Sequence, residues 1–490
     1  MGGMACAARL AAKGHTVTVF EQSDTWGGKL GLATWGQHRF DTGPSLLTLP
    51  AVYRDLFLKT GRPLEESVNV VELETAFRYQ FADGTVLKLP GVGIGACATA
   101  IGDVLGGQSA EQWRKFMKRA ADMWAVTRKP FLERPLHGFR SLLAMSWRVG
   151  DIRTIAPTRT LRSLATHYFS DPRLISLVDR YATYSGSDPR QAPAALATIP
   201  YVEQTFGAHH VQGGLRELGN ALFQRCCDLG VAFEFGTSIA SIQADTAVKS
   251  VTTTSGRTVM CDIVVANVDA HNVYHHLLDA NLPSVRQAQS NLTKVTPSLS
   301  GFVATLAMRD TTTDLEHHNI WFPENYEDEF DSVFGVGKPA QPTPDPAIYV
   351  CNPRDDSMAP PGSESWFVLV NAPRHSDTPD ETTVNWNDVS RVSEYQQNIF
   401  DRLASRGFDI RNRLLWSDTI SPSDLAHRTA SPGGAIYGTS SNGMRAAFLR
   451  PANITAIAGL FLVGGSSHPG GGLPLVGMSA EIVANHIGRA

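Results

Sequence analysis

A glycine-rich loop near the C-terminus separates an apolar, strand-like run from a helix-like segment. The run covers residues 459–465, and the helix is expected over residues 476–487. Glycines before a helix N-terminus leave its backbone N–H groups accessible, and the positive end of the helix dipole then attracts negative charge. This pattern predicts a site for an anionic group or for a ring that gains negative charge. The residues expected to face that ligand are Gly464, Gly465, Gly472, Leu473 and Pro474.

His468 lies in the same loop and carries a side chain that could transfer protons. We favour a packing role for it over a catalytic one, and we name no catalytic residue. The six cysteines show no zinc-type spacing, and no Ser/His/Asp arrangement has persuasive spacing. The sequence therefore predicts chemistry carried by an organic cofactor, and no metal.

The N-terminal residues supply a second part of a ligand site. An alanine-rich helix is expected over residues 4–13 and a buried strand over residues 16–20, and Glu21 follows directly. In a β-α-β dinucleotide unit, glycines before such a helix admit a pyrophosphate, and an acid after the second strand binds a ribose hydroxyl. Gly3 fits the third glycine and Glu21 fits the acid. The first strand and two glycines are absent, so we expect about ten more residues to be encoded in frame upstream.

Two short motifs after Glu21 suit a flat cofactor. The first is Gly-Gly-Lys, whose paired glycines have no Cβ and let the backbone approach a ring closely. The second is Asp-Thr-Gly-Pro, which by itself would be an ordinary turn. Their order behind a nucleotide half-motif favours cofactor contact. The residues assigned to it are Gly27, Gly28, Lys29, Asp41, Gly43 and Pro44.

These motifs and the closing segment 459–484 resemble the carotenoid (phytoene) desaturase family of the flavin amine-oxidase superfamily. The resemblance covers nearly the whole chain and implies FAD as cofactor. It implies that the glutamate holds the adenosine ribose, that Gly-Gly-Lys runs beside the cofactor, and that the Asp-Thr-Gly-Pro turn lies near the flavin. It also implies a backbone contact near Ile239 on the adenine side. A single nucleotide unit is visible and an acid repels a 2′-phosphate, so FAD is expected rather than NAD(P).

The resemblance also implies an α/β (α+β) fold class. A Rossmann-like FAD-binding domain would be interleaved with a substrate domain of antiparallel sheet plus helices. A strand, an Asp-Gly turn and a strand around residues 81–86 predict a hairpin in that second domain. The expected division gives residues 1–75, 206–270 and 431–490 to FAD binding, residues 76–205 to a helical, membrane-contacting part of the substrate domain, and residues 271–430 to its remainder.

The implied activity is desaturation of a carotenoid or carotenoid precursor. A hydride leaves an allylic carbon for the flavin, a proton leaves the neighbouring carbon, and a conjugated double bond forms. The closing loop also resembles that of hydroxycarotenoid 3,4-desaturases and terminal carotenoid oxygenases of the same family. A flavin amine oxidase and a non-catalytic, truncated relative are the alternatives outside that activity. The sequence names no proton acceptor and no oligomeric state.

Residues 113–148 combine many cations with aromatic and apolar residues, and their only acids are Asp122 and Glu133. Such a segment suits a membrane surface, where a lipid-soluble substrate would be met. A helical subdomain with a buried apolar face is the alternative. The net charge of −4 and the lack of an apolar run of ~18 residues favour neither nucleic-acid binding nor a membrane span. The expected location is cytoplasmic, peripherally associated with the membrane.

Overall fold

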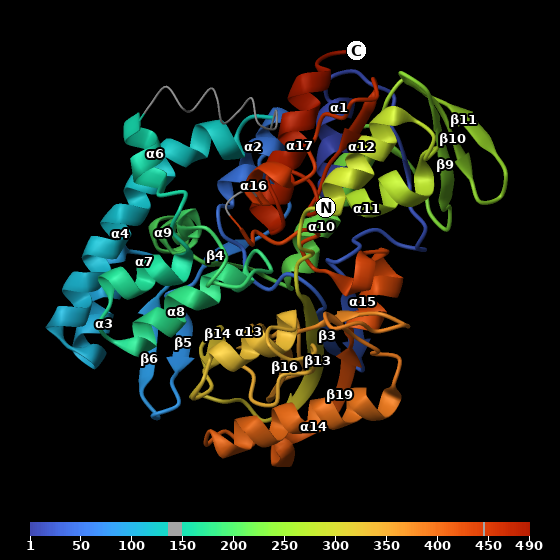
Figure 1. Cartoon of the computed structure of the whole chain (residues 1–490). Helices are drawn as coiled ribbons and strands as arrows, with labels where there is room; N and C mark the ends of the chain where they lie inside the picture. The colour runs from blue at the N-terminus through green and yellow to red at the C-terminus, as the bar shows by residue number, and fades with distance from the viewer. Residues whose placement is uncertain (136–148, 444–445) are drawn as a thin grey trace.

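The computed structural model describes residues 1–135, 149–443 and 446–490, leaving aside the side chains of residues 149, 447 and 448. Segments far apart in the sequence lie side by side in it. The first helix, α1 (Gly2–Ala11), packs against the last, α17 (Leu473–Ile487), at the top of Figure 1.

Two parallel strand pairs lie beside these helices. β1 (Thr18–Phe20) pairs with β8 (Ala232–Glu234), and β12 (Val264–Ala266) pairs with β20 (Leu460–Leu462). α1, α17 and α10 (Leu215–Asp228) share an apolar core with them. Parts from the beginning, middle and end of the chain therefore build one α/β unit of the nucleotide-binding kind.

Two antiparallel arrangements flank this unit. β9 (Ile239–Ala244), β10 (Val248–Thr253) and β11 (Thr258–Met260) form a small sheet at the upper right of Figure 1. β4 (Val70–Glu72) pairs with β7 (His209–Val211), so two connections between the halves of the molecule run together.

A seven-stranded sheet forms the core of the other half. Its neighbours are antiparallel except for β14 and β5, which are parallel, so the expected antiparallel sheet is in fact mixed. The expected hairpin is confirmed, because β5 and β6 are joined through the Asp-Gly turn. The strand order is β19 (Leu414–Ile420), β13 (Ser300–Arg309), β16 (Ser363–Ala372), β15 (Ile348–Cys351), β14 (His318–Trp321), β5 (Thr75–Gln80) and β6 (Val86–Pro90).

The two faces of this sheet have different neighbours. Phe302 and Leu306 of β13 pack with α14 (Val389–Ser405), which runs along the bottom of Figure 1. Val303 faces the opposite way, towards the helices at the left of the figure, because side chains alternate along a strand. Those helices are α3 (Ile94–Leu105), α4 (Gly107–Thr127), α6 (Val149–Ile155), α7 (Leu161–Tyr168), α8 (Pro172–Thr183) and α9 (Thr198–Phe206), with the π-helical turn η2 (Arg128–Leu132) after α4.

Shorter elements complete the described chain. The remaining described α-helices are α2 (Ala51–Lys59), α11 (Ala270–Asn272), α12 (Pro283–Leu292), α13 (Glu327–Phe334), α15 (Pro422–Thr429) and α16 (Ala446–Leu449), and the remaining strands are β2 (Leu32–Trp35), β3 (His38–Asp41), β17 (Arg374–His375) and β18 (Thr383–Val384).

Two aromatic side chains of α4, those of Trp113 and Phe116, lie in the core, whereas that of Trp124 is only partly buried. Trp113, Phe116 and Met123 are all 0% exposed, as the helical-subdomain alternative expects. The cations of α4 lie on its outer side, as in an ordinary amphipathic helix. The part of the basic segment at residues 136–148 lies outside the described residues. Among the helices that the structure describes, none combines the length and apolarity needed to cross a bilayer.

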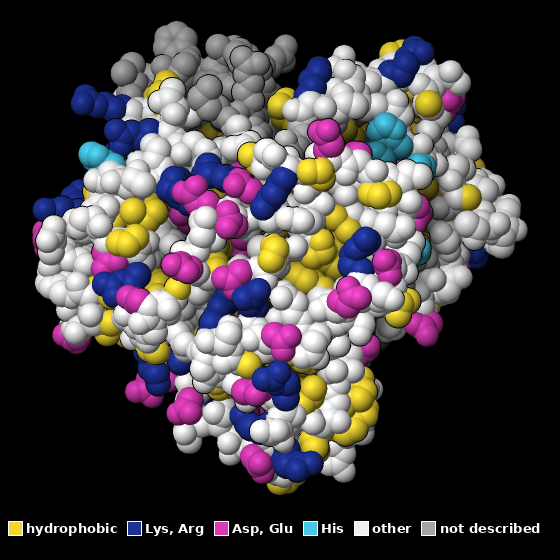
Figure 2. All heavy atoms as spheres, turned by 60° about the horizontal axis from the view of Figure 1, so that its bottom comes forward, with side chains coloured by type: hydrophobic (Ala, Val, Ile, Leu, Met, Phe, Trp, Pro, Cys, Tyr) yellow, Lys and Arg dark blue, Asp and Glu magenta, His cyan; other side chains and the backbone are white. Residues whose placement is uncertain are grey.

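Local elements follow the sequence pattern with small shifts. The alanine-rich helix starts at Gly2 instead of residue 4, and the strand expected over residues 16–20 is paired only over Thr18–Phe20. The helix extends because the Gly3 backbone N–H donates to the Asn267 side chain, which anchors its first turn. On the face drawn in Figure 2, basic and acidic side chains are intermingled, with hydrophobic side chains between them.

Candidate functional site

A continuous cavity of about 2020 Å³ connects the nucleotide-type unit with the seven-stranded sheet and the helices. It begins at the N-terminus of α1 and the end of β1, passes the glycine-rich loop before α17, and continues between the sheet and α8 and α9 to α6. Of the residues predicted to bind the cofactor, all but Asp41 line this cavity. They are Gly3, Glu21, Gly27, Gly28, Lys29, Gly43, Pro44, Ile239, Gly464, Gly465, Gly472, Leu473 and Pro474.

Two helix N-termini open into the same end of the cavity. α1 brings Gly2 and Gly3 to it, and α17 brings Leu473. Both helices therefore direct the positive ends of their dipoles into one space, where a ligand with phosphates and an electron-accepting ring would meet them. Glu21 lies at the edge of this space, and its carboxylate accepts a hydrogen bond from the Ser23 backbone N–H (3.0 Å).

The glycines of the loop before α17 have distinct reasons to be glycine. Gly464 has φ +104° and lies against the Asn267 side chain, so a side chain there would be both strained and crowded. Gly472 has φ +100° and faces open space, where a Cβ would occupy the cavity itself. Gly465 has no such backbone constraint and borders the cavity. The backbone turn therefore requires a glycine at Gly464, and the lack of side chains at Gly465 and Gly472 keeps the cavity open.

Lys29 is held firmly in the cavity wall. Its Nζ donates to the backbone oxygens of Ala435 (2.8 Å) and Ile436 (2.9 Å). Burial lowers the pKa of the Lys29 ammonium to about 8, partly offset by the carboxylate of Asp269. The side chain therefore ties the Gly-Gly-Lys segment to the segment before α16, and it remains mainly charged at neutral pH.

Asp41 has a different position from its predicted neighbours. Its two carboxylate oxygens accept from the backbone N–H groups of Leu215 (2.6 Å) and Arg216 (3.0 Å), so it caps the N-terminus of α10. Burial raises the pKa of Asp41 to about 6 despite these bonds. Asp41 supports the wall behind Thr42 and Gly43 and does not line the cavity.

Three residues that the sequence did not single out hold the site together. Asn267 bonds the Gly3 N–H and donates to the Val463 oxygen (3.2 Å). Arg450 donates to the oxygens of Tyr437, Thr439 and Gly465 at 2.7–3.1 Å. Arg216 lies over the Trp26 ring, with 3.6 Å from its central carbon to the ring centroid, and donates to the Leu30 oxygen. Asn267 directly follows β12 and Arg450 directly follows α16, and the sequence patterns described above assign a role to neither residue.

His468 is a buried loop residue. It is 4% exposed, and its Nε2 lies 3.0 Å from the Arg134 backbone oxygen. Burial lowers the pKa of His468 to about 4, so the ring is neutral at physiological pH. These contacts agree with the packing role that the sequence favoured.

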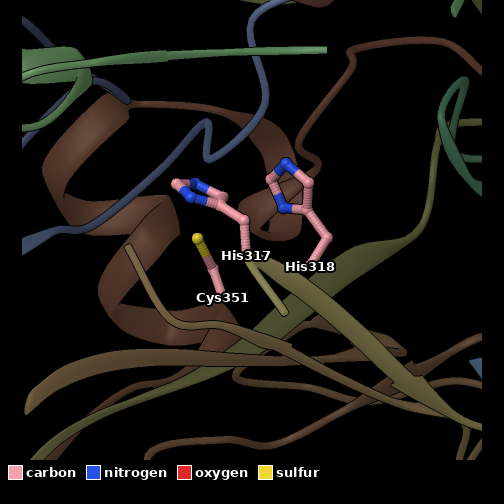
Figure 3. Close-up of side chains that lie close together, drawn as sticks. All are labelled: His317, His318 and Cys351. Carbon is pink, nitrogen blue, oxygen red and sulfur yellow. The ribbon is translucent and has the colours of Figure 1, made fainter. Parts of the chain in front are cut away.

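A hydrogen-bonded chain leads from the cavity wall into the sheet. The Ser45 hydroxyl lies 2.7 Å from the Tyr349 hydroxyl, which lies 2.7 Å from Nδ1 of His318. His317 and Cys351 are next to His318, and Figure 3 shows the three side chains converging from neighbouring strands. Ser45 and Tyr349 border the cavity, so this polar chain is the sheet's contribution to the site.

The His317, His318 and Cys351 cluster is built as a neutral, hydrogen-bonded group. Its possible ligand atoms all lie within 4.8 Å of one another. Nδ1 of His318 already bonds Tyr349, and burial raises the pKa of the Cys351 thiol to about 12. The thiol would therefore have to lose its proton before it could bind a metal, whereas Nε2 of His318 has no hydrogen-bond partner among the described residues.

The cavity fits a flavin dinucleotide. One end offers glycines, two helix N-termini and a carboxylate, which suit pyrophosphate and ribose. The part between the α17 loop and Ser45 is bordered by Lys29, Gly43 and Pro44, which suit a ring system. From there the cavity continues as a passage with mostly apolar walls, which include Trp124, Leu132, Ile152, Ile155, Leu196, Ile199 and Val202.

The sequence matches a known family over almost its full length. The family is described as flavin containing amine oxidoreductase, and the match covers residues 1–487. A 1-hydroxycarotenoid 3,4-desaturase of Flavobacterium sp. (strain P99-3) is 32% identical over 493 residues, covering 99% of this chain and 97% of the relative. A 4,4′-diapolycopene oxygenase of Methylomonas sp is 29% identical, covering 99% and 96%.

Solved structures show the same fold at low identity. Wild-type putrescine oxidase bound to putrescine aligns with a TM-score of 0.65 at 14% identity, covering 99% of this chain and 96% of that one. An oxidoreductase from Methanosarcina mazei aligns with a TM-score of 0.62 at 15% identity, covering 99% and 98%. The expected α/β fold class is confirmed.

Proposed function

This chain belongs to the flavin-containing amine oxidoreductases and is an FAD-dependent oxidoreductase related to carotenoid desaturases; from that premise we propose that it introduces conjugated double bonds into a carotenoid-type polyene. The observation that carries the proposal is the shape of the cavity. A glycine-lined dinucleotide end and a long passage with mostly apolar walls form one space, and they meet at the α17 loop. A long hydrocarbon could therefore reach the ring position while its length stays out of water.

FAD bound in the cavity supplies a two-electron acceptor for a hydride from an allylic carbon. The chain contributes the surroundings. The α17 N-terminus at Leu473 favours negative charge beside it, and Lys29 adds a fixed cation. The apolar walls exclude water and align the polyene, so that one carbon–carbon bond at a time lies at the reacting position.

The two relatives are named for different carotenoid activities, desaturation and oxygenation, and sequence identity favours desaturation here. One relative is named a 3,4-desaturase and the other an oxygenase. The desaturase is the more similar of the two, at 32% against 29% identity. Terminal oxygenation is therefore the second candidate, and it uses the same cavity.

We further propose the domain division that the sequence predicts, with FAD binding by residues 1–75, 206–270 and 431–490 and the substrate domain between them. Its support is that β1, β8, β12 and β20 come from the first set, whereas the seven-stranded sheet comes from the second except at the start of β5. The chain crosses between the sets where β4 and β7 pair.

Peripheral membrane attachment is a part of the same proposal. The apolar passage reaches Leu132 of η2 and Ile152 of α6, and Ile152 is exposed. The exposed cations Arg128, Lys129 and Arg153 lie on the same two elements. Such a rim could rest on an anionic bilayer and accept a lipid-dissolved substrate directly.

The activity is tested by expressing the chain in cells that supply phytoene, neurosporene or a hydroxylated carotenoid in turn. We expect a red shift in carotenoid absorbance with at least one substrate, because each new double bond lengthens the conjugated system. Gly465→Val tests the role of the cavity. Gly465 borders the cavity without a positive φ, so the Val side chain should occupy cavity space without straining the backbone and should abolish the shift. FAD-loaded protein that shifts none of the three substrates would contradict desaturation and favour an amine oxidase.

A further inference from the structure

Desaturation releases a proton as well as a hydride, and several ionisable side chains that border the cavity are poorly placed to accept it. Lys29 is charged and donates to two backbone oxygens. The His468 ring faces the backbone oxygen of Arg134, so the nitrogen at that contact carries a hydrogen and donates it. Glu203 accepts from the Tyr181 hydroxyl through Oε1, and its Oε2 is buried. The proton acceptor is therefore to be sought elsewhere in the wall.

Ser45 begins a hydrogen-bonded chain that leads away from the cavity. It follows Gly43 and Pro44, borders the cavity and is partly exposed. Its hydroxyl lies 2.7 Å from the Tyr349 hydroxyl, which lies 2.7 Å from Nδ1 of His318. A hydroxyl group can accept one proton while it donates another. The chain therefore connects the cavity with an imidazole ring through two hydroxyl groups.

The seven-stranded sheet holds the far end of this chain in place. His318 of β14 pairs in register with Cys351 of β15, two residues after Tyr349, so all three side chains lie on one face of the sheet. The His318 ring is 0% exposed and stacks on the Phe77 ring of β5, with 4.9 Å between the centroids. Its Nε2 has no hydrogen-bond partner among the described residues. Nδ1 is therefore the ring nitrogen that engages the chain.

The buried His318 ring is neutral and can take up a proton. Burial, together with the nearby side chains of Arg180 and His210, lowers the pKa of His318 to about 3. A base of this strength is sufficient, because the substrate carries a positive charge once the hydride has left, and its neighbouring C–H bond is then strongly acidic. The same weakness lets the ring return the proton to water when the product leaves the cavity.

We propose that Ser45 is the proton acceptor of the reaction and that Tyr349 and His318 relay the proton away from it. The C–H bond beside the allylic carbon breaks, and its electron pair forms the new double bond. The proton joins the Ser45 oxygen while the Ser45 hydrogen moves to Tyr349 and the Tyr349 hydrogen moves to Nδ1 of His318. The hydride carries the other electron pair to FAD, so the substrate loses two hydrogens and two electrons. This inference rests on the proposed desaturation.

The relay requires one particular tautomer of His318 in the resting protein. Nδ1 must be unprotonated, so that it accepts from Tyr349, and Nε2 must carry the hydrogen. Nitrogen-15 NMR of FAD-loaded protein labelled at histidine tests this without substrate, and loss of the His318 signals in His318→Asn assigns them. We expect an unprotonated Nδ1 at neutral pH. A hydrogen on Nδ1 would be donated to Tyr349 and would overturn the relay.

Three variants test the chain in turnover, with the substrate that gives a red shift in cells. Ser45→Ala and Tyr349→Phe should each lower kcat roughly 100-fold, with KM and FAD content unchanged, because a positioned general base contributes ~10²–10⁴-fold. His318→Asn keeps an acceptor oxygen near the Nδ1 position but cannot take up the proton, so it should be equally slow. Ser185→Ala is the matched control, since Ser185 borders the cavity but donates to the Ala182 oxygen, and its kcat should not change.

Isotope effects distinguish a lost proton acceptor from a general disturbance. Deuterium at the carbon that loses the proton should slow the three variants more than the wild type, whereas a structural defect would leave this isotope effect unchanged. Ser45→Ala and Tyr349→Phe each remove a single oxygen atom, so either supplies the test if the other fails to bind FAD or to fold. Wild-type kcat in folded Ser45→Ala or Tyr349→Phe, or an unchanged isotope effect, would overturn the relay and leave desaturation standing. FAD-loaded wild type that desaturates no polyene would overturn the proposed function itself.

Discussion

At the residue scale, Glu21 has the position that ribose recognition requires. It directly follows β1 and borders the cavity together with the N-terminus of α1. A carboxylate there accepts hydrogen bonds from ribose hydroxyls, each charge-assisted bond contributing roughly 1.5–3 kcal/mol. Glu21→Ala should therefore raise the dissociation constant of FAD about 10- to 100-fold, measured by fluorescence titration.

The matched control is Glu234→Ala. Glu234 pairs in register with Phe20 on the neighbouring strand, but it faces Arg257 and does not line the cavity. Its removal should leave FAD affinity unchanged. Equal FAD affinity in the wild type and Glu21→Ala would show that the ribose is held by backbone groups alone.

Asp41 gives a pH-dependent signature of its role as a helix cap. Its folded-state pKa of about 6 is above the ordinary value of 3.8, because burial penalises the charged carboxylate. Its contribution to stability is therefore fully present below pH ~4 and is lost as the pH rises through 6. The unfolding free energy of the wild type relative to Asp41→Asn should fall by roughly 1–2 kcal/mol between pH 4 and pH 7 in urea titrations.

Asp171→Asn provides the comparison for that measurement. The Arg173 side chain lowers the pKa of Asp171, so Asp171 titrates below this pH window. The unfolding free energy of the wild type relative to Asp171→Asn should therefore stay nearly constant between pH 4 and pH 7. If the unfolding free energy of the wild type relative to Asp41→Asn instead rises with pH, the hydrogen bonds to α10 outweigh the cost of burying the charged carboxylate.

At the scale of elements, the prediction of membrane attachment rests on the residues at the end of the apolar passage. Leu132 of η2 and Ile152 of α6 border the passage, and Trp113 and Phe116 of α4 are committed to the core. FAD-loaded protein should float with anionic liposomes at low salt and partly dissociate at high salt, because salt screens the cations. The double variant Leu132→Ser, Ile152→Ser should bind at least ~10-fold more weakly, since apolar insertion is lost.

Met260→Ser is the control for flotation. Met260 is 75% exposed on β11, in the small sheet on the other side of the molecule in Figure 1. If both changes weaken binding equally, attachment is non-specific. If the wild type does not float at low salt, the rim around the passage is a solvated surface.

At the scale of the whole molecule, the cavity exists only because distant segments meet. The cofactor end takes residues from α1, from the segment before β9 and from the α17 loop. The passage takes its walls from α8, α9 and the cavity-facing side of the seven-stranded sheet. The interleaving of the chain thus places an apolar passage against a dinucleotide end without a linker between two independent domains.

The sequence by itself determined the cofactor end, the family and most local elements. Glycine loops, a strand-terminal acid and a helix start are local patterns whose function depends on backbone conformation, so they can be recognised without the fold. Local patterns together with the family resemblance also pointed to Gly27, Lys29, Gly464 and Pro474, and all four line one cavity. These patterns misjudged the surroundings of Trp113, because an amphipathic helix carries no mark of what will cover its apolar face.

The tertiary structure decided everything that depends on contacts between distant residues. Asp41 became a cap because α10 starts beside it, and Tyr349 joined Ser45 to His318 because β15, which carries Tyr349, pairs with β14, which carries His318. The environment of Arg180 also depends on such contacts. Its residue type gives its charge, but its burial in an apolar wall results from the packing of α8 against the sheet. Desolvation is a property of the assembled core, and no local pattern encodes it.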